Sequence, residues 1–575
     1  MSRLLDNRVR TAYRGIRLKQ QRPQIAQHIE REFKLGSIAA RILAARGFKP
    51  DQDLKNFIAP SLKEGLPDPR KLKNLDAACA LISEIAASGG KVAICCDFDV
   101  DGLSGGAQAN HFLTAAGVET RVFVPDRFTD GYGLNERLIK AAADWGAKLL
   151  IAIDYGTRNQ KEIAVAKALG LKTIVIDHHH VGSAAPGADV FINPQQRGCG
   201  FAGGILCASG LVWYLLVGLR SKLPRAANLD VRSYLDLACL GTICDMVPLI
   251  GANRVIAKRG LDLLGTTKRP GLVALKSVIG INGEVSCSNV GFGIGPRLNA
   301  AGRMVHGEMV IDLLTTDDSE LAARVARQLN KLNTERQETE LRVKEIAVEY
   351  IRGSGYLPSG LVVWDKEFHT GVIGIVAQRL VEQFYRPAVV MGLDTDGIFK
   401  GSVRGIKGFS VVEALEACAE HLIKCGGHEG AGGFSVEEAR IEAFKEAFEA
   451  ECARRLDSIE VVPYAEADTE AQLEDIEMDL VHELEQFAPF GMGNPGPQIL
   501  LAGLKVVEVK ILKNAHLKAT FSDGKRYLAG FLWRQTSHPA LNVGATVNVV
   551  CKPDYSVFNG QTEIQANLQA IEKAA

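Results

Sequence analysis

The chain has 575 residues, of which 47% are hydrophobic and 23% charged, and its 67 basic side chains are balanced by 67 acidic ones. A chain of this length is expected to form about three or four domains, and this composition is that of an ordinary globular protein. The balanced charge excludes a global positive field, so any binding of nucleic acid has to rely on local patches.

One such patch lies in the N-terminal arm, within a predicted helical and basic region of residues 1–70. Basic residues there face only Asp6: Arg3, Arg8, Arg10, Arg14, Arg17, Lys19 and Arg22. A solvated arm is the simpler interpretation, and a contact with nucleic acid is the alternative.

The cysteines and the longest apolar run indicate a protein of the reducing cytoplasm. The twelve cysteines include no C-x-x-C pair, and several, such as Cys95 and Cys207, lie in apolar runs where a reduced thiol behaves as a small hydrophobic group. The apolar run from Ile205 to Leu219 is shorter than the roughly 20 residues of a membrane span, so we expect a buried helix and no membrane association. The N-terminus has no apolar segment of the signal-peptide kind, so secretion is not expected.

From about Leu81 to Ile192 the sequence alternates strand-like and helix-like segments, for example VAICC followed by a helical stretch through Ala115. This alternation predicts a first α/β domain, with a parallel sheet and helices on both faces. In such sheets ligands bind beyond the carboxyl ends of the strands. The chemistry of this domain is therefore expected at the strand ends.

A long helix is predicted over residues 319–352, because this stretch contains neither Gly nor Pro and ends before Gly353. It would be roughly 50 Å long and, being polar, would bridge two domains. A second, smaller α/β domain is expected over residues 353–455.

The region 456–575 contains a Pro/Gly-rich link from Pro489 to Pro497 and a strand-rich end. In that end, Asn559 and Gly560 signal a tight hairpin. A small β-barrel of the OB type is predicted for this region.

Three carboxylates follow the first predicted strand directly: Asp97, Asp99 and Asp101 in CCDFDVDGLSGG. The pattern D-x-D-x-D-G also begins an EF-hand calcium loop, which requires a bidentate Glu at its twelfth position and a preceding helix. Here the twelfth residue is Gln108 and the preceding segment reads as a strand, so an EF-hand is excluded. Acids packed this closely repel one another and persist where cations or basic partners neutralise them; a solvated acidic turn is the alternative.

Acids and histidines also follow other predicted segments. Asp154 follows LLIAI, Asp177 to His180 follow TIVI, and Asp245 follows the apolar segment ACLGTIC. A single strand-end Asp is more often a helix cap and a His cluster can be a surface accident, but their repetition in four segments favours a metal cluster.

The ligand types narrow the choice of metal. Oxygen-rich ligands with imidazole suit Mn²⁺ or Mg²⁺ better than Zn²⁺, and the number of acids indicates two ions. Two ions about 4 Å apart activate a water and clamp the oxygens of an in-line displacement. The sequence therefore predicts hydrolysis of phosphoesters.

Several motifs extend this prediction. DFDVDG, the strand-end Asp154, DHHH and GTICDMVPL resemble, in order and spacing, the motifs of the DHH phosphoesterase superfamily. GPRLNAAGR, HTGVIGIVAQRL, GSVRG and GGHEGAGGFS are similar to those of its bacterial single-strand-specific 5′ to 3′ DNA exonucleases. The resemblance covers most of the chain and implies a DHH catalytic domain at 71–318, a connecting helix at 319–352, a DHH-associated nucleic-acid-binding domain at 353–455 and an OB-like domain at 456–575.

The resemblance also implies roles for single residues. The metal ligands would be Asp97, Asp99, Asp101, Asp154, His178 and Asp245. Asp154 would bridge the ions, His179 would complete the shell or orient the leaving group, and Asp177 would fix an imidazole tautomer. Phosphate and DNA would be held by Arg127, Arg303, Ser402, Arg404 and His428; without the family, tight turns and surface ion pairs would be the simpler reading of these residues.

The predicted function is 5′ to 3′ hydrolysis of single-stranded DNA to nucleoside 5′-monophosphates, with the strand entering between the two α/β domains. Barrel aromatics are available for stacking on bases, although most are expected in the core: Phe521, Tyr527, Phe531, Trp533, Tyr555 and Phe558. The resemblance further implies a helicase and a single-strand-binding protein as partners in recombination and repair, and we expect a monomer.

Two alternatives remain open. One is a DHH phosphodiesterase for short oligonucleotides or cyclic dinucleotides, against which the additional strand-rich C-terminal region argues. The other is a non-catalytic DNA-binding scaffold, against which the complete set of acids and histidines argues.

Overall fold

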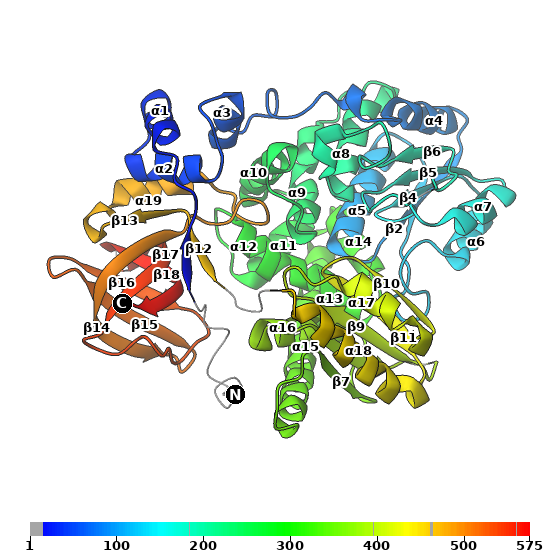
Figure 1. Cartoon of the computed structure of the whole chain (residues 1–575). Helices are drawn as coiled ribbons and strands as arrows, with labels where there is room; N and C mark the ends of the chain where they lie inside the picture. The colour runs from blue at the N-terminus through cyan, green and yellow to red at the C-terminus, as the bar shows by residue number, and fades with distance from the viewer. Residues whose placement is uncertain (1–14, 183, 395, 460–463, 559–560, 575) are drawn as a thin grey trace. The chain divides into compact units, whose positions relative to one another are not determined.

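The computed structural model describes residues 15–182, 184–394, 396–459, 464–558 and 561–574 (Figure 1). The chain divides into two compact units. Unit 1 comprises Met1–Leu54, Gln337–Phe487 and Gly496–Ala575, and unit 2 comprises Lys55–Arg336 and Ala488–Pro495. Most of the predicted basic arm, up to Arg14, and the Asn559-Gly560 turn lie outside the described residues.

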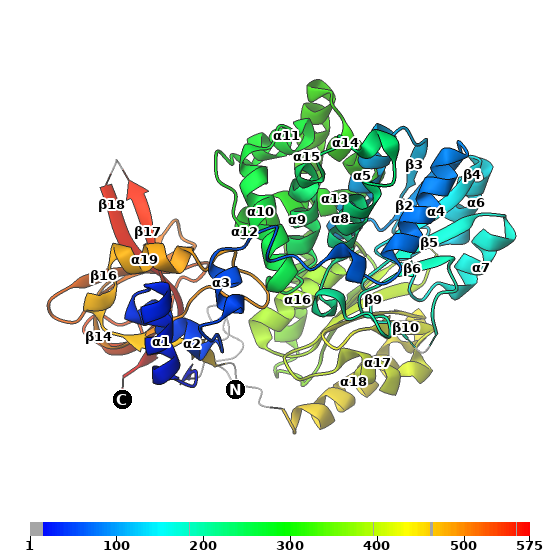
Figure 2. The same ribbon diagram turned by 90° about the horizontal axis from the view of Figure 1, so that it is seen from above.

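Unit 2 contains a five-stranded sheet in which all strands run parallel, in the order β3-β2-β4-β5-β6 (Figure 2). The strands are β2 (Lys91–Cys96), β3 (Thr120–Phe123), β4 (Ala147–Ile153), β5 (Lys172–Ile176) and β6 (Val190–Ile192). Cys96 pairs with Ile153, and Ile153 pairs with Ile176. Because these paired residues end their strands, the residues that follow them lie along one edge of the sheet, as the sequence predicted.

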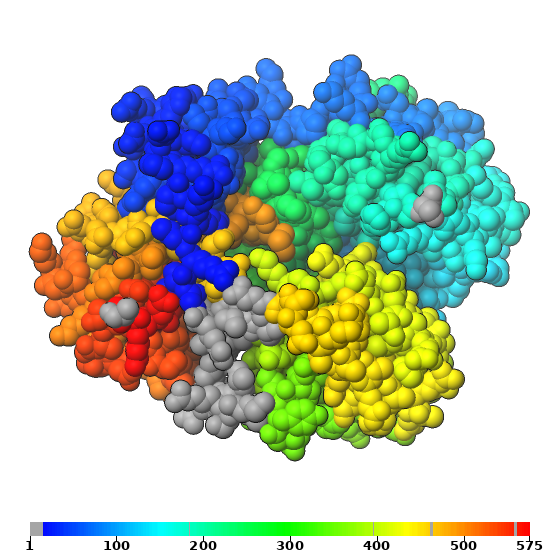
Figure 3. All heavy atoms as spheres, viewed as in Figure 1, coloured from blue at the N-terminus to red at the C-terminus, as the bar shows by residue number. Residues whose placement is uncertain are grey.

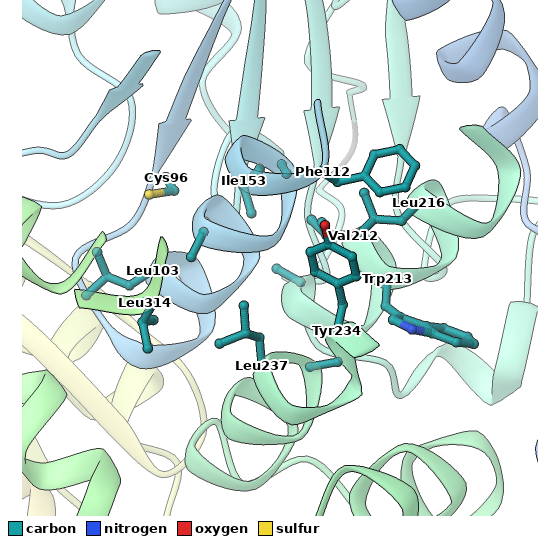
Figure 4. Close-up of a cluster of buried hydrophobic side chains, with 14 of the residues drawn as sticks. Cys96, Leu103, Phe112, Ile153, Val212, Trp213, Leu216, Tyr234, Leu237 and Leu314 are labelled. Carbon is teal, nitrogen blue, oxygen red and sulfur yellow. The ribbon is translucent and has the colours of Figure 1, made fainter. Parts of the chain in front are cut away.

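Alternate residues of the strands face two separate cores, which explains why the strands read as continuous apolar runs. Val92 and Ile94 of β2 belong to the core formed with α4 (Leu75–Ala87), α5 (Val100–Ala115) and α8 (Ala208–Leu219). Ala93 and Cys95 belong to the core formed with α6 (Glu136–Asp144) and α7 (Gln160–Ala168). Figure 4 shows part of the first core, including Phe112 of α5 and Leu216 of α8.

The apolar run at Ile205 to Leu219 forms the buried helix α8, as predicted, and in the described residues no helix is long and apolar enough to cross a membrane. Further helices complete this part of the chain: α9 (Leu235–Cys244), α10 (Gly251–Thr266), α11 (Pro270–Ile279), α13 (Gly295–Met304) and α14 (Glu308–Thr315). The predicted long helix is confirmed as α15 (Ser319–Gly353), whose residues are divided between the two units.

Unit 1 contains a second sheet in the order β10-β11-β9-β8-β7, in which β7 and β8 are parallel and the other pairs antiparallel. Its elements are β7 (Leu361–Asp365), α16 (Ile373–Phe384), β8 (Ala388–Leu393), β9 (Phe399–Arg404), α17 (Val411–Ala417), β10 (Lys424–Gly427), β11 (Ala431–Val436) and α18 (Ile441–Leu456). The second, smaller α/β domain predicted from the sequence is therefore present.

The C-terminal strands form the predicted barrel. The strands β14 (Ile499–Leu512), β15 (His516–Ser522), β16 (Tyr527–Leu532), β18 (Gln561–Lys573) and β17 (Thr546–Phe558) are neighbours in this order, and β17 pairs with β14 to close the sheet. Of the proposed stacking aromatics whose side chains are described, only Phe521 is buried, whereas Tyr527 and Trp533 are exposed. The expectation that most of them belong to the core was wrong, because a strand alternates between the two faces of its sheet. The side chain of Phe558 is not among those that the structure describes.

The N-terminal strand β1 (Ile16–Leu18) pairs in parallel with β12 (Ala465–Ala467), which precedes the barrel. Lys19 binds the buried Asp468 at 2.9 Å, and Arg46 of the segment after α2 (Ser37–Ala45) binds the same carboxylate at 2.7 Å. Figure 3 shows this N-terminal segment, in blue, against the orange and yellow segments that it contacts. Lys19 of the basic arm is therefore anchored by an ion pair, and the interpretation as a solvated arm was wrong for this residue.

Candidate metal centre

The sheet edge of unit 2 carries three buried acids that directly follow strands: Asp97, Asp154 and Asp177, which follows β5 and is 1% exposed. Asp97 follows β2 and is 3% exposed, and Asp154 follows β4 and is 2% exposed. Asp154 has a φ of 68°, in the left-handed region that non-glycine residues rarely adopt, and its N–H donates to the carbonyl of Ile176 at 2.9 Å. Backbone strain of this kind persists where the surrounding structure enforces it and is concentrated at functional sites.

The other two acids of the DFDVDG motif are oriented by helix termini. Asp99 caps α5, and its carboxylate accepts from the N–H of Asp101 at 2.9 Å. Asp101 is 1% exposed, and its two oxygens accept from the N–H groups of Ala208 and Ser209, at the start of α8, at 2.7 and 2.9 Å. The glycine that ends the motif is required by packing, because a Cβ on Gly102 would lie 2.7 Å from the backbone of Asp97.

His178 is the point at which the acids converge. Its Nε2 lies 3.2 Å from Asp154 Oδ1, 3.5 Å from Asp245 Oδ2 and 3.8 Å from Asp101 Oδ2. Three groups of side chains each offer ligand atoms within 4.8 Å of one another: Asp154, His178 and His179; Asp101, His178 and Asp245; and Asp97, Asp99 and Asp154. Asp154 and His178 each belong to two of these groups. His180 is exposed and belongs to none of them.

Asp177 is fully occupied by hydrogen bonds within the protein. Its Oδ1 accepts from the N–H of His178 at 2.7 Å and from Nδ1 of His179 at 2.7 Å, and its Oδ2 accepts from the N–H of Thr157 at 2.9 Å. Burial opposes both shifts, yet these contacts lower the pKa of Asp177 and raise the pKa of His179 to about 9. Asp177 thus holds the ring of His179 through its Nδ1 atom.

The electrostatics of the cluster favour the binding of a cation. Burial, together with the charges of neighbouring acids, raises the pKa of Asp97 and Asp154 and raises the pKa of Asp245 to about 8. Burial lowers the pKa of His178, which favours the neutral imidazole that binds metals. Asp97 Oδ1, Asp154 Oδ1 and His178 Nε2 are buried without a hydrogen-bond partner. These oxygen and nitrogen atoms lack hydrogen-bond partners and are directed at one another. They therefore suit the binding of divalent cations as metal ligands.

One residue of the centre was missed by sequence reasoning. The hydroxyl of Tyr132 lies 3.3 Å from the carbonyl of Asp154 and 3.3 Å from Nε2 of His179. The available signal was its position in VPDRFTDGYG, the motif that also contains Arg127. That motif follows a strand of the same sheet, so its residues were candidates for the same edge.

The two basic residues predicted to bind phosphate in unit 2, Arg127 and Arg303, have different surroundings. The Arg127 guanidinium lies over the ring of Phe98, 4.4 Å from its centroid, and burial lowers its pKa while the charges of Asp97 and Asp99 raise it. Arg303 is half-buried near the end of α13, and the preceding Gly302 packs against the carbonyl of Phe98. Their roles in binding phosphate remain predictions.

The other predicted DNA-binding residues lie in unit 1. Arg404 donates from Nη1 to Ser402 Oγ at 2.9 Å, and Gly374 in the first turn of α16 lies close to both side chains. A helix N-terminus with an arginine is a common arrangement for binding phosphate. His428 lies between β10 and β11, and its N–H donates to the carbonyl of Ala431 at 2.7 Å. The contact of Ser402, Arg404 and His428 with DNA stays a prediction.

Known protein families match three regions of the chain. The family described as "DHH family, N-terminal domain" matches residues 91–242, the "DHHA1 domain" matches 312–454, and the "RecJ OB domain" matches 467–570. The first region contains the acids and histidines of the cluster from Asp97 to His179, with Asp245 just beyond its end, the second contains the sheet with Ser402 and Arg404, and the third contains most of the barrel. The domain boundaries at residues 70, 318, 352 and 455 remain predictions.

Two relatives share sequence over most of the chain. The "Single-stranded-DNA-specific exonuclease RecJ" of Bacillus subtilis (strain 168) is 33% identical over 490 residues, which are 84% of this chain and 61% of that relative. The protein of the same name from Salmonella typhimurium is 32% identical over 560 residues, which are 93% of this chain and 96% of that relative. The chain thus spans about three fifths of the first relative's length and nearly all of the second's.

Solved structures agree with these relatives. The crystal structure of RecJ in complex with Mn²⁺ from Thermus thermophilus has a TM-score of 0.82 and 28% identity, covering 98% of this chain and 80% of that one. The complex with Mg²⁺ from the same organism has a TM-score of 0.78 and 27% identity, covering 98% and 79%. With its DHH, DHHA1 and OB regions in this order and its acids and histidines gathered at one sheet edge, this chain belongs to the RecJ family.

Proposed function

We propose that this protein is a metal-dependent exonuclease that degrades single-stranded DNA in the 5′ to 3′ direction and releases nucleoside 5′-monophosphates. The observation that carries the proposal is the convergence of acids from separate segments on His178, with Asp154 shared between two potential ligand groups. The relatives are named as single-stranded-DNA-specific exonucleases, which supports the choice of substrate.

Two divalent ions, Mn²⁺ or Mg²⁺, would be held by residues of the three ligand groups: Asp97, Asp99, Asp101, Asp154, His178 and Asp245. Bound there, two such ions would polarise phosphate oxygens and activate a water for in-line attack. The RecJ structures with Mn²⁺ and with Mg²⁺ support both choices of ion. Asp154 is the expected bridge, because its carboxylate is the one shared between the group with His179 and the group with Asp97.

The remaining residues of the centre would position the substrate. Asp177 fixes His179, whose Nε2 lies beside the Tyr132 hydroxyl at the exposed side of the cluster. His179 is thereby placed to hold a proton or hydrogen bond at the leaving oxygen. Arg127, whose guanidinium interacts with the charges of Asp97 and Asp99, suits a terminal 5′-phosphate.

The barrel would hold the incoming strand, because it presents an aromatic surface beside positive charge. The rings of Phe531 and Trp533 are stacked, with centroids 5.6 Å apart and an angle of 14° between their planes. Lys518 lies 5.7 Å from the Phe531 centroid, and the Trp533 ring is fixed by a 2.8 Å hydrogen bond from Nε1 to Asn567. Such a surface stacks on unpaired bases with little regard to sequence.

We further propose that the protein acts as a monomer in the cytoplasm, in recombination and repair. Its substrate has a free single-stranded 5′ end, which intact duplex does not offer. A helicase that unwinds DNA and a single-strand-binding protein that keeps the strand open would therefore supply the substrate.

The proposal is tested with metal-stripped protein and 5′-phosphorylated single-stranded DNA. We expect no nucleotide release until Mn²⁺ is added, and then release of 5′-mononucleotides from the 5′ end. The Asp154→Ala variant should abolish release and retain DNA binding, whereas Asp262→Ala, at an exposed ion pair on α10, should behave as the wild type. Normal cleavage by Asp154→Ala, or hydrolysis of cyclic dinucleotides in place of DNA, would contradict the proposal.

A further inference from the structure

Asp245 is positioned differently from the acids that directly follow strands. It caps the C-terminal end of α9, and the next residue, Met246, has a φ of 58° and is 63% exposed. The loop from Asp245 to Ile250 therefore leaves the helix by a strained turn. The direction of the Asp245 carboxylate depends on what holds the residues after it.

Those residues are held by the segment Ala488–Pro495, which lies far along the chain yet belongs to unit 2. The N–H of Leu249 donates to the carbonyl of Met492 at 2.7 Å. The segment itself is folded into a tight turn in which Gly491 and Asn494 exchange backbone hydrogen bonds of 2.9 and 3.1 Å. Asn494, only 3% exposed, closes the turn by donating from Nδ2 to the carbonyl of Pro489.

The glycines of the segment permit this close approach. A Cβ on Gly491 would lie 2.7 Å from Leu249 Cδ1, and a Cβ on Gly493 would lie 2.9 Å from Pro248 Cβ and 3.2 Å from Pro248 Cα. Gly493 also has a φ of 72°. The segment is therefore packed against both Pro248 and Leu249, with no room for a side chain.

The first turn of α10 fastens the loop and the segment together. Asn253 donates from Nδ2 to the carbonyl of Pro248 at 3.0 Å. The buried Arg254 donates from Nη2 to the carbonyl of Ala488 at 2.8 Å and from Nε to the carbonyl of Phe57 at 2.8 Å. A buried guanidinium that donates to two carbonyls is costly to disturb, so these contacts fix the segment firmly.

We propose that the segment Ala488–Pro495 is a positioning element for Asp245, which holds the loop after α9 so that the carboxylate reaches the ion shared with His178 and Asp101. The inference rests on the proposed function, because it takes Asp245 as a metal ligand. Groups that orient a ligand without touching the metal commonly change metal affinity by about 10- to 100-fold when they are altered. The segment would thus tune metal binding from a region of the chain outside the matched DHH family residues 91–242.

The test is Mn²⁺ binding to the full-length protein, measured from the electron paramagnetic resonance signal of free Mn²⁺. Gly493→Ala should weaken binding by about 10-fold or more, because the added methyl group pushes on Pro248. The matched control is Gly503→Ala, since Gly503 in β14 has a φ of 69° and a methyl group added to it would have no neighbour within 4 Å. It carries the same backbone strain and should bind Mn²⁺ as the wild type does.

A second arm asks whether the effect passes through Asp245. In an Asp245→Ala background, Gly493→Ala should weaken Mn²⁺ binding no further, whereas a general loss of structure would weaken it again. If Gly493→Ala does not fold, Mn²⁺ binding is measured for Gly491→Ala instead, both alone and in the Asp245→Ala background, with the same expected results. The inference alone is overturned if the glycine variant binds Mn²⁺ with wild-type affinity, or if the glycine substitution weakens Mn²⁺ binding just as much in the absence of Asp245. A wild-type protein that binds no Mn²⁺ overturns the proposed function as well.

Discussion

The acids at the sheet edge and the acid after α9 approach the same histidine by different routes. Asp154 is placed by strand pairing, since Ile153 pairs with both Cys96 and Ile176 and the next residues share one edge. Asp245, 3.5 Å from His178, is placed by a loop that a distant segment supports. The proposed metal centre thus combines residues placed by sheet register with a residue whose loop is held by a segment distant in the chain.

The largest expected effect is on the sheet-edge side. Asp154→Asn keeps the shape of the side chain and removes its charge, so we expect cleavage of single-stranded DNA to fall by about 10²- to 10³-fold, as when a group that stabilises transition-state charge is lost. The metal-free variant should be no less stable than the wild type, because a buried, repelled carboxylate has been removed. Measured kcat and thermal unfolding decide this; a variant that loses stability together with activity would contradict the assignment.

A smaller effect is expected for Asp177, the residue that holds the ring of His179. Asp177→Asn removes the charge that raises the pKa of His179 to about 9, so the pKa of His179 should fall in the metal-free protein, and Mn²⁺ affinity should drop by about 10- to 100-fold. Histidine NMR titration and Mn²⁺ binding measure the two quantities. Asp189→Asn is the matched control, since Asp189 accepts two hydrogen bonds from Thr173, at the opposite end of β5. An unchanged His179 pKa in Asp177→Asn would refute the role given to this pair.

In the barrel, binding of single-stranded DNA should be separable from metal-dependent cleavage. Trp533→Ala should weaken binding of a long single strand by about 1–3 kcal/mol and leave kcat on short oligonucleotides unchanged. Fluorescence anisotropy and single-turnover kinetics would show it, with Tyr356→Ala as the control for an exposed aromatic outside the barrel. Equal losses in binding and kcat would place Trp533 outside a purely binding role.

The smallest effect is expected on stability without metal. The carboxyl of Asp245, with its pKa raised by burial and by neighbouring acids to about 8, binds its proton more tightly in the folded than in the unfolded state. Stability should therefore decrease as pH rises from the ordinary carboxyl pKa of about 4 to about 8, and Mn²⁺ should reverse this loss. Scanning calorimetry with chelator and with Mn²⁺ would test it; a Tm that is independent of pH in chelator would speak against the repulsion.

The sheet-edge part of the centre could be predicted because it follows from local patterns. Apolar runs identify strands, alternation with helices makes them parallel, and the first polar residue after each run must then lie at the ligand-binding edge. Asp97, Asp154 and Asp177 follow that rule, and His178 comes directly after Asp177. The same logic predicted α15 from its uninterrupted helical sequence.

The rest depends on contacts that no local pattern contains. The sequence marked Pro489 to Pro497 as a link but gave no sign that Met492 binds Leu249, because the two are distant in the chain and no periodicity relates them. The hydrogen bonding of Tyr132 with His179 depends on how a loop folds back over the sheet. In the barrel, composition suggested that most aromatics are core, whereas Trp533, in the turn after β16, is half exposed.

The most direct test of the metal centre is anomalous diffraction from crystals grown with Mn²⁺. We predict two Mn²⁺ ions at the sheet edge of unit 2, both contacted by Asp154, with His178 and Asp245 at one of them. Mn²⁺ peaks that lie away from Asp154, or Asp154 and His178 contacting no ion, would contradict it.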